Sequence, residues 1–193
     1  MRSILRIALS LTLLCIITSG VLVFARTMTS EKIKTQQLSY VQGAILKEIL
    51  KEASNNPIED RFDLSYGDTI ISFFPAYFLD GQKAIAFEIF GNGFSGKVGV
   101  MIVVNIQTQQ VLGIDITTHN ETPGIGSLAK TTYSFKNQFT RFKIGNDFRP
   151  RHRGGEIDVI TGATLTSSAV CEAVENAGKI YHKLSPEIMT HLK

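Results

Sequence analysis

The chain has 193 residues, of which 44% are hydrophobic and 19% are charged. This composition excludes a disordered or collagen-like chain, and the length predicts one compact domain plus an additional segment. The formal net charge of +3 is too small for the electrostatic footprint of a nucleic-acid-binding protein, so no nucleic acid partner is expected. Two cysteines, Cys15 and Cys171, are too few for a disulfide-rich scaffold or a cysteine-based zinc or iron–sulfur site.

An uncharged stretch near the N-terminus, Ile7–Ala25, predicts a transmembrane helix. A helix of this length is roughly 28 Å long, close to the hydrocarbon thickness of a bilayer. We interpret it as an uncleaved anchor, because the apolar region of a signal peptide is usually about 7–15 residues long. A cleaved signal peptide is the alternative, since Val23-Phe24-Ala25 resembles a small-residue cleavage site. In both cases the rest of the chain is expected to be delivered across the membrane.

The charges that flank this stretch do not decide its orientation. Cations stand on both sides of it in equal numbers: Arg2, Arg6 and the terminal amine before it, and Arg26, Lys32 and Lys34 after it. The positive-inside rule therefore neither opposes nor strongly supports either topology.

A second helix is expected after the anchor, over Thr29–Lys51, with Ser30 as its N-cap. Its apolar positions Val41, Ala44, Ile45 and Ile49 have helical spacing, and Asn55-Asn56-Pro57 should end it. The hydrophobic period then changes to that of strands. Asp80-Gly81 predicts a hairpin, and sequential strands of an antiparallel meander are expected to be neighbours. The predicted strands are Ile70–Leu79, Lys83–Phe90, Lys97–Ile106 and Val111–Thr118.

Helices are expected to follow the strands. The sequence predicts a turn at Thr122–Gly126, a helix near Ser127–Arg141, and a final helix after Ser167. The final helix would place Val170, Ala173, Val174, Ala177, Tyr181 and Leu184 on one face. Helices covering an antiparallel sheet make an α+β domain. We therefore divide the chain into an anchor (1–28), a helical connector (29–58) and a domain (59–193).

A basic run lies between the two predicted helices of the domain. It lacks the interleaved aromatic residues of a base-stacking platform, which favours a solvated loop or a partner-facing surface. A phosphate contact from one of its arginines remains an alternative. The run comprises Arg141, Lys143, Arg149, Arg151, His152 and Arg153.

The segment Asp158–Ser167, the 158–167 loop, is rich in hydroxyl groups and leads into the final helix. Gly162 and Ala163 leave the backbone sterically open, and free N–H groups of the first helical turn would point toward the loop. Those groups and the helix dipole favour a bound phosphate. The alternative is an ordinary Ser/Thr N-cap, which opens very many helices.

Asp158-x-x-Thr161-Gly162-Ala163-Thr164 resembles the flavinylation motif of the FMN-binding domain family. In that family a flavin transferase joins the phosphate of FMN to the threonine after Gly-Ala. The resemblance implies that Thr164 carries the phosphoester, that Thr161, Gly162 and Ala163 contact the cofactor, and that Asp158 belongs to the recognition signal. Thr166 is a nearby hydroxyl outside the motif position.

Two further segments resemble the same family. The 119–126 turn, His119–Gly126, is similar to the family's His-x-Glu-Thr-Pro-Gly-Leu-Gly turn, with Ile125 in place of leucine. The 93–96 segment, Gly93-Phe94-Ser95-Gly96, is similar to its Gly-Tyr-Ser-Gly sequence. The resemblance implies that Glu121, Thr122 and Gly124 lie against the flavin. Ordinary turn chemistry explains Thr122-Pro123-Gly124 equally well.

Within the family the resemblance is closest to the G subunit of Rnf-type electron transport complexes, with the C subunit of the sodium-pumping NADH:quinone oxidoreductase related. It implies a flavoprotein subunit that relays electrons through covalent FMN and is not catalytically complete alone. In Rnf-type complexes electrons pass between ferredoxin and NAD, coupled to sodium or proton movement. The implied partners are the other membrane subunits and, during maturation, the flavin transferase.

The same resemblance bears on topology, because the family is flavinylated by an exported transferase. We therefore expect a single-pass protein of the inner (cytoplasmic) membrane, with its N-terminus cytoplasmic and its FMN domain on the periplasmic side. Cys171 would then have no partner within the chain. Two other functions remain open: a stand-alone anchored flavoprotein reductase or redox sensor, and a non-redox anchored binding domain.

Overall fold

The computed structural model describes residues 2–192, without the side chains of residues 2, 3 and 31–39. The chain divides into two compact units, Met1–Val41 and Gln42–Lys193. Arg2, Lys32 and Lys34, used above for the charge comparison, have side chains outside the described part. The division into anchor, connector and domain stays a prediction.

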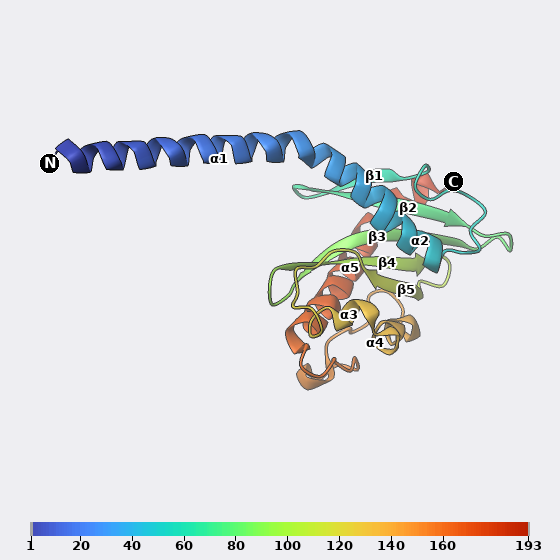
Figure 1. The fold of residues 1–193 in the computed structure, drawn as a ribbon. Coiled ribbons are helices and arrows are strands. Elements are labelled where there is room, and N and C mark those ends of the chain that lie inside the picture. The colour runs from blue at the N-terminus through green and yellow to red at the C-terminus, as the bar shows by residue number, and fades with distance from the viewer. Residues whose placement is uncertain (1, 193) are drawn as a thin grey trace. The chain divides into compact units, whose positions relative to one another are not determined.

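The first unit contains helix α1, Arg2–Gln36 (Figure 1). Its Ile4–Ser30 part has a mean hydropathy of 2.5 and no buried residue, so it is long and apolar enough to cross a membrane. The expectation that a new helix starts at Ser30 is wrong. Ser30 Oγ donates a hydrogen bond to the carbonyl of Thr27 inside α1. No proline or glycine lies between Arg26 and Gln36. The hydroxyl groups of Thr27, Thr29 and Ser30 bond to carbonyls of the preceding turn instead of capping a new helix.

A short π-helical segment, η1 (Gln37–Gln42), precedes helix α2, Gly43–Ile49. Helix α2 ends several residues before the predicted stop at Asn55-Asn56-Pro57. Asn55 instead fixes the following loop, because its side chain donates to the carbonyl of Pro75 and accepts from the N–H of Tyr77 (both 2.9 Å). Ala44 is exposed, contrary to expectation, and the buried residues here are Gly43, Ile45, Leu46 and Leu50.

Five antiparallel strands form one sheet in the order β1-β2-β3-β4-β5. The predicted meander and its hairpin are confirmed: Gly81 has a φ of +84°, and the N–H of Phe78 bonds to the carbonyl of Gln82 (2.9 Å). Strand β1 was not predicted, because it is only five residues long and lies at the edge of the sheet. The strands are Phe62–Tyr66, Thr69–Tyr77, Lys83–Asn92, Lys97–Asn105 and Val111–Ile116.

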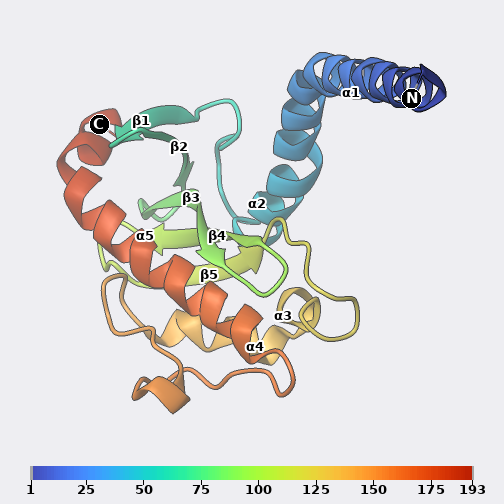
Figure 2. The same ribbon diagram turned by 90° about the vertical axis from the view of Figure 1, so that its left-hand side faces the viewer.

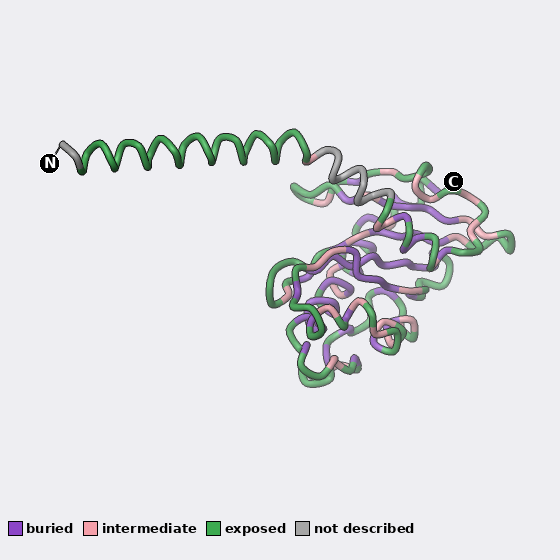
Figure 3. The backbone as a smooth tube through the Cα atoms, in the orientation of Figure 1, coloured by how far each residue is buried: buried purple, intermediate pink, exposed green. Residues whose placement is uncertain are grey.

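Helix α5, Thr164–His191, crosses one face of the sheet and packs mainly on β3 and β4 (Figure 2). Gly91 of β3 allows this approach, because a Cβ there would overlap the carbonyl of Ala169. Cys171 is buried in this layer, and burial raises the pKa of its thiol to about 12. Every apolar residue predicted for the packed face is buried: Val170, Ala173, Val174, Ala177, Tyr181 and Leu184. Figure 3 shows that the central strands β3 and β4 are buried along most of their length.

Short helices connect β5 to α5 where the sequence predicts one helix over Ser127–Arg141. Thr132 is extended (φ −82°, ψ 98°) and separates α3, Leu128–Thr131, from α4, Tyr133–Asn137. Two 3-10 turns follow, η2 (Phe139–Arg141) and η3 (Arg151–Arg153). All the residues of the basic run are exposed. The expected α+β fold, an antiparallel sheet covered by helices, is confirmed.

Candidate functional site

The 158–167 loop reaches helix α5 through a left-handed turn. Gly162 has a φ of +81°, a conformation that glycine adopts without steric cost. The N–H of Ala163 closes the turn on the carbonyl of Ile160 (2.9 Å). Ser167, from inside the helix, accepts the N–H of Ile160 at its hydroxyl (3.1 Å). The loop is therefore held from both ends, and α5 already begins at Thr164, whereas the sequence predicted the helix only after Ser167.

The first turn of α5 has open backbone donors. Its cap residue is Ala163, which makes no side-chain cap hydrogen bond, and the turn contains no acidic residue. The Ser/Thr N-cap considered as an alternative is therefore absent from the described loop. The N–H groups of an uncapped first turn have no intrahelical acceptor, and the positive end of the helix dipole lies there. This arrangement suits a phosphate group.

The 119–126 turn places a buried acid beside exposed backbone. Glu121 is buried, whereas Thr122 and Gly124 are exposed. The carbonyl of Thr122 accepts the N–H of Ile125 (3.2 Å), and Gly124 has a φ of +76°. The predicted turn chemistry is therefore present.

The 93–96 segment is a tight loop at the end of β3, closed by a hydrogen bond from the N–H of Gly93 to the carbonyl of Gly96 (2.8 Å). Phe94, at its tip, is 71% exposed. The N–H of Ser95 donates to Oε1 of Glu121 (3.0 Å). This bond ties the segment to the 119–126 turn.

The three segments line one pocket of about 330 Å³. Five of the predicted site residues line it: Glu121, Thr122, Gly162, Ala163 and Thr164. Three others do not: Thr161 and Gly124 are exposed beside it, and Asp158 is exposed on the surface of the loop. Asp158 accepts two hydrogen bonds from Arg151 (2.6 and 3.1 Å).

The pocket also has lining residues that were not among the predicted site residues. Phe94, Ile125 and Leu165 supply exposed apolar side chains, and Gly126 and Thr166 complete the wall. All of them sit within or next to the three segments, so their proximity in sequence was the available signal. Their inward direction depends on the fold of each turn and could not be deduced from composition.

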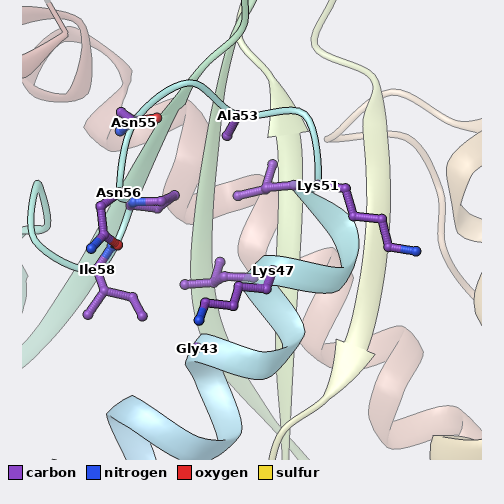
Figure 4. A pocket seen from close by; sticks show the side chains of 10 residues that line it. Gly43, Lys47, Lys51, Ala53, Asn55, Asn56 and Ile58 are labelled. Carbon is purple, nitrogen blue, oxygen red and sulfur yellow. The ribbon is translucent and has the colours of Figure 1, made fainter.

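Another pocket, of about 260 Å³, lies between α2 and the loop after it (Figure 4). Lys47, Lys51, Asn55 and Asn56 surround it. None of the three segments contributes a residue to it, so it is not the candidate site.

Comparison with known proteins finds one family whose model matches all three segments. Residues 93–179 match the family described as FMN-binding domain. The resemblance predicted from the sequence is confirmed. The matched range contains the 93–96 segment, the 119–126 turn and the 158–167 loop, and hence every residue that lines the pocket.

Curated relatives extend the similarity along most of the chain. The G subunit of the ion-translocating oxidoreductase complex of Vibrio cholerae serotype O1 is 29% identical, over 88% of this chain and 86% of that protein. The protein of the same name from Methanosarcina acetivorans is 24% identical, over 91% of this chain and 93% of its own length. The crystal structure of Shewanella oneidensis NqrC shares the fold, with a TM-score of 0.51 and 16% identity over 72% of this chain and 73% of that one.

The residues present fit FMN. Open N–H groups of the first turn of α5 suit its phosphate, and Thr164 is exposed at that position. The apolar side chains of Phe94, Ile125 and Leu165 at the same pocket suit a flat aromatic ring. Pockets that take small ligands combine apolar walls with a few polar groups in this way.

A partly buried acid outside the pocket, Glu88 on β3, gives a prediction about pH. Burial raises its pKa, although hydrogen bonds from Thr117 and from Nε2 of Gln42 act in the opposite direction. The folded protein therefore binds this proton more tightly than the unfolded chain, so the group's contribution to stability is fully present below its ordinary pKa. That contribution is lost as the pH rises through the raised pKa.

Replacing Glu88 by glutamine is expected to leave the unfolding temperature unchanged near pH 4 and to raise it near pH 8. Gln42 has a buried Oε1 without a hydrogen-bond partner among the described residues, so rotation of its amide accommodates the new side chain. Thermal unfolding of both proteins across this pH range measures the effect. Equal curves at pH 8 would show that burial of Glu88 has no energetic cost.

Proposed function

We propose that this chain is a membrane-anchored flavoprotein subunit that relays electrons through FMN joined to Thr164, within an ion-translocating oxidoreductase complex. The observation that carries the proposal is the meeting of three family segments at one pocket beside the uncapped first turn of α5. The relatives named as G subunits of such complexes support membership in one. Bound FMN supplies the redox chemistry, and the protein supplies its position and surroundings.

Attachment requires a free hydroxyl, and Thr164 offers one at the surface. Its Oγ1 forms an ester bond to the phosphorus of an activated flavin phosphate, the hydroxyl proton leaves, and the bond from that phosphorus to the donor's leaving group breaks. No oxidation or reduction occurs in this step. The uncapped N–H groups of α5 would hold the phosphate oxygens, and Thr161, Gly162 and Ala163 would form the adjoining backbone.

The flavin transferase is proposed to recognise Asp158. The exposed carboxylate of Asp158 is paired with Arg151. The backbone N–H of Asp158 donates to Oε1 of Gln138 (2.8 Å), and its carbonyl accepts from Nε2 of Gln138 (3.1 Å). Thr122 and Gly124 are proposed to lie along the cofactor. Electron transfer between ferredoxin and NAD, with sodium or proton movement, belongs to the assembled complex, and this chain alone is not catalytically complete.

Intact-protein mass spectrometry of the full chain purified from its native membranes tests the proposal. We expect the mass of the chain plus one FMN less one water, retention of the N-terminal residues, and co-purification of other membrane subunits. A flavin adduct without co-purifying subunits would favour a stand-alone reductase or redox sensor. A colourless protein without an adduct would favour a non-redox binding domain.

Topology gives a separate prediction. We propose that the N-terminus is cytoplasmic and that the FMN-binding domain lies on the periplasmic side of the inner membrane, where an exported transferase reaches Thr164. Protease added to intact spheroplasts is expected to digest the domain, slowly if partner subunits shield it. Full protection until the inner membrane is ruptured would overturn this topology.

A further inference from the structure

The three segments of the site meet at one buried carboxyl group, that of Glu121. Its Oε1 accepts the N–H of Ser95 (3.0 Å), and its Oε2 accepts the hydroxyl of Thr166 (2.6 Å). Glu121 is 5% exposed and Thr166 is 3% exposed. One side chain of the 119–126 turn therefore connects the 93–96 segment to the first turn of α5.

Two glycines close around this carboxyl group. A Cβ added at Gly93 would lie 2.5 Å from Oε1 of Glu121, and one added at Gly126 would lie 2.8 Å from Oε2. Both distances are shorter than a van der Waals contact, so the backbone of two segments packs directly against the carboxyl oxygens. Packing as well as hydrogen bonding thus sets its position.

The two threonines of this turn differ in their surroundings. Thr166 is buried, and its hydroxyl is donated to Glu121. Thr164, two residues earlier, is exposed at the pocket. Residues two apart on a helix do not share a face, so holding Thr166 inward turns Thr164 outward.

We propose that Glu121 is a positioning residue for flavin attachment. By fixing Thr166 and the 93–96 segment, it presents Thr164 to the transferase and withholds the hydroxyl of Thr166. This inference rests on the proposed function, since it concerns the same attachment step. It assigns Glu121 an action through Thr166 and Ser95, whereas the family resemblance implied contact with the flavin.

A matched pair of variants tests this role: Thr166→Ser keeps the hydroxyl, and Thr166→Val replaces it with a methyl group of similar size. The full chain is produced in membranes with the flavin transferase, and the initial rate of covalent loading is followed by in-gel fluorescence and normalised to folded protein. We expect Thr166→Ser to load within about twofold of the wild-type rate. Thr166→Val should load roughly tenfold more slowly, the equivalent of about 1.4 kcal/mol for one lost hydrogen bond.

Peptide fragmentation locates the flavin, and it should lie on Thr164 in all these proteins. Equal rates for the serine and valine variants, or flavin on Thr166 of the wild type, would overturn the proposal. Glu121→Leu is similar in size but removes both acceptors, so it should load at least as slowly as Thr166→Val. A slow Glu121→Leu together with a fast Thr166→Val would instead assign Glu121 to direct contact with the flavin.

Amide hydrogen exchange at Ser95 tests the same connection without any flavin. In detergent-solubilised full chain made without transferase, Thr166→Val should exchange this amide at least severalfold faster than Thr166→Ser, because the carboxyl that accepts it is no longer held. Unchanged exchange would overturn the connection. If the wild type takes no flavin but the exchange rates differ as expected, the proposed function fails while the positioning by Glu121 stands.

Discussion

Replacing Thr164 by valine is expected to abolish covalent flavin attachment while the domain still folds. The side chain is exposed, and its hydroxyl makes no hydrogen bond among the described residues, so little packing energy is at stake. Valine has nearly the same shape but provides no oxygen for the phosphoester. Fluorescence of the denatured protein band should fall from full intensity to background.

The control is Thr164→Ser, which keeps an acceptor hydroxyl at the same place and should remain fluorescent. Thermal unfolding of the flavin-free proteins should give similar temperatures for all three. Persistent fluorescence in Thr164→Val would move the attachment to another hydroxyl, with Thr166 the nearest by sequence. Its burial and its bond to Glu121 argue against that outcome.

Replacing Gly91 by alanine is expected to prevent the close packing of α5 on the sheet. The added Cβ would overlap the backbone carbonyl of Ala169, and a backbone group cannot rotate away as a side chain can. Overpacking of this kind costs about 3 kcal/mol or more. For a domain of this size that corresponds to a fall of roughly 10 °C in unfolding temperature.

Gly67→Ala is the matched control for this prediction. Gly67 has a φ of +60° but nothing within 4 Å of an added Cβ, so the change introduces backbone strain without overlap. It should cost only about 1 kcal/mol. If thermal unfolding shows equal losses for the two variants, the approach of β3 and α5 is not the constraint that the structure indicates.

The fold was predictable where the hydrophobic period is clear. The residues of β2 to β5 and the buried face of α5 repeat with the spacing of strands and of a helix, so their packing followed from pattern alone. The prediction of a helix start at Ser30 was wrong because a serine can either cap a new helix or bond back to the preceding turn. Here its hydroxyl bonds to the carbonyl of Thr27 within α1. The helix predicted over Ser127–Arg141 is divided at Thr132, whose backbone is extended. The residue types around Thr132 do not specify that conformation.

The site was predictable as three segments but not as one arrangement. Thr164, Gly162 and Glu121 were found through family motifs, whereas Phe94 and Leu165 depend on the direction in which each turn points its side chains. The bond between Glu121 and Thr166 joins residues that are far apart in the chain. Its existence depends on the docking of α5, which no local pattern encodes.

Helix α5 follows all five strands in the sequence, and this order has a consequence for maturation. In the proposed topology the chain crosses the membrane from its N-terminal side, so the sheet would emerge before the helix that covers it. Thr164 and Cys171 both belong to that last helix. In the proposed oxidising compartment, Cys171 is open to oxidation until α5 docks, and burial then removes its reactive thiolate. The loop proposed to receive the flavin acquires its shape at the same moment, so we expect flavinylation to follow the completion of folding rather than to accompany translocation.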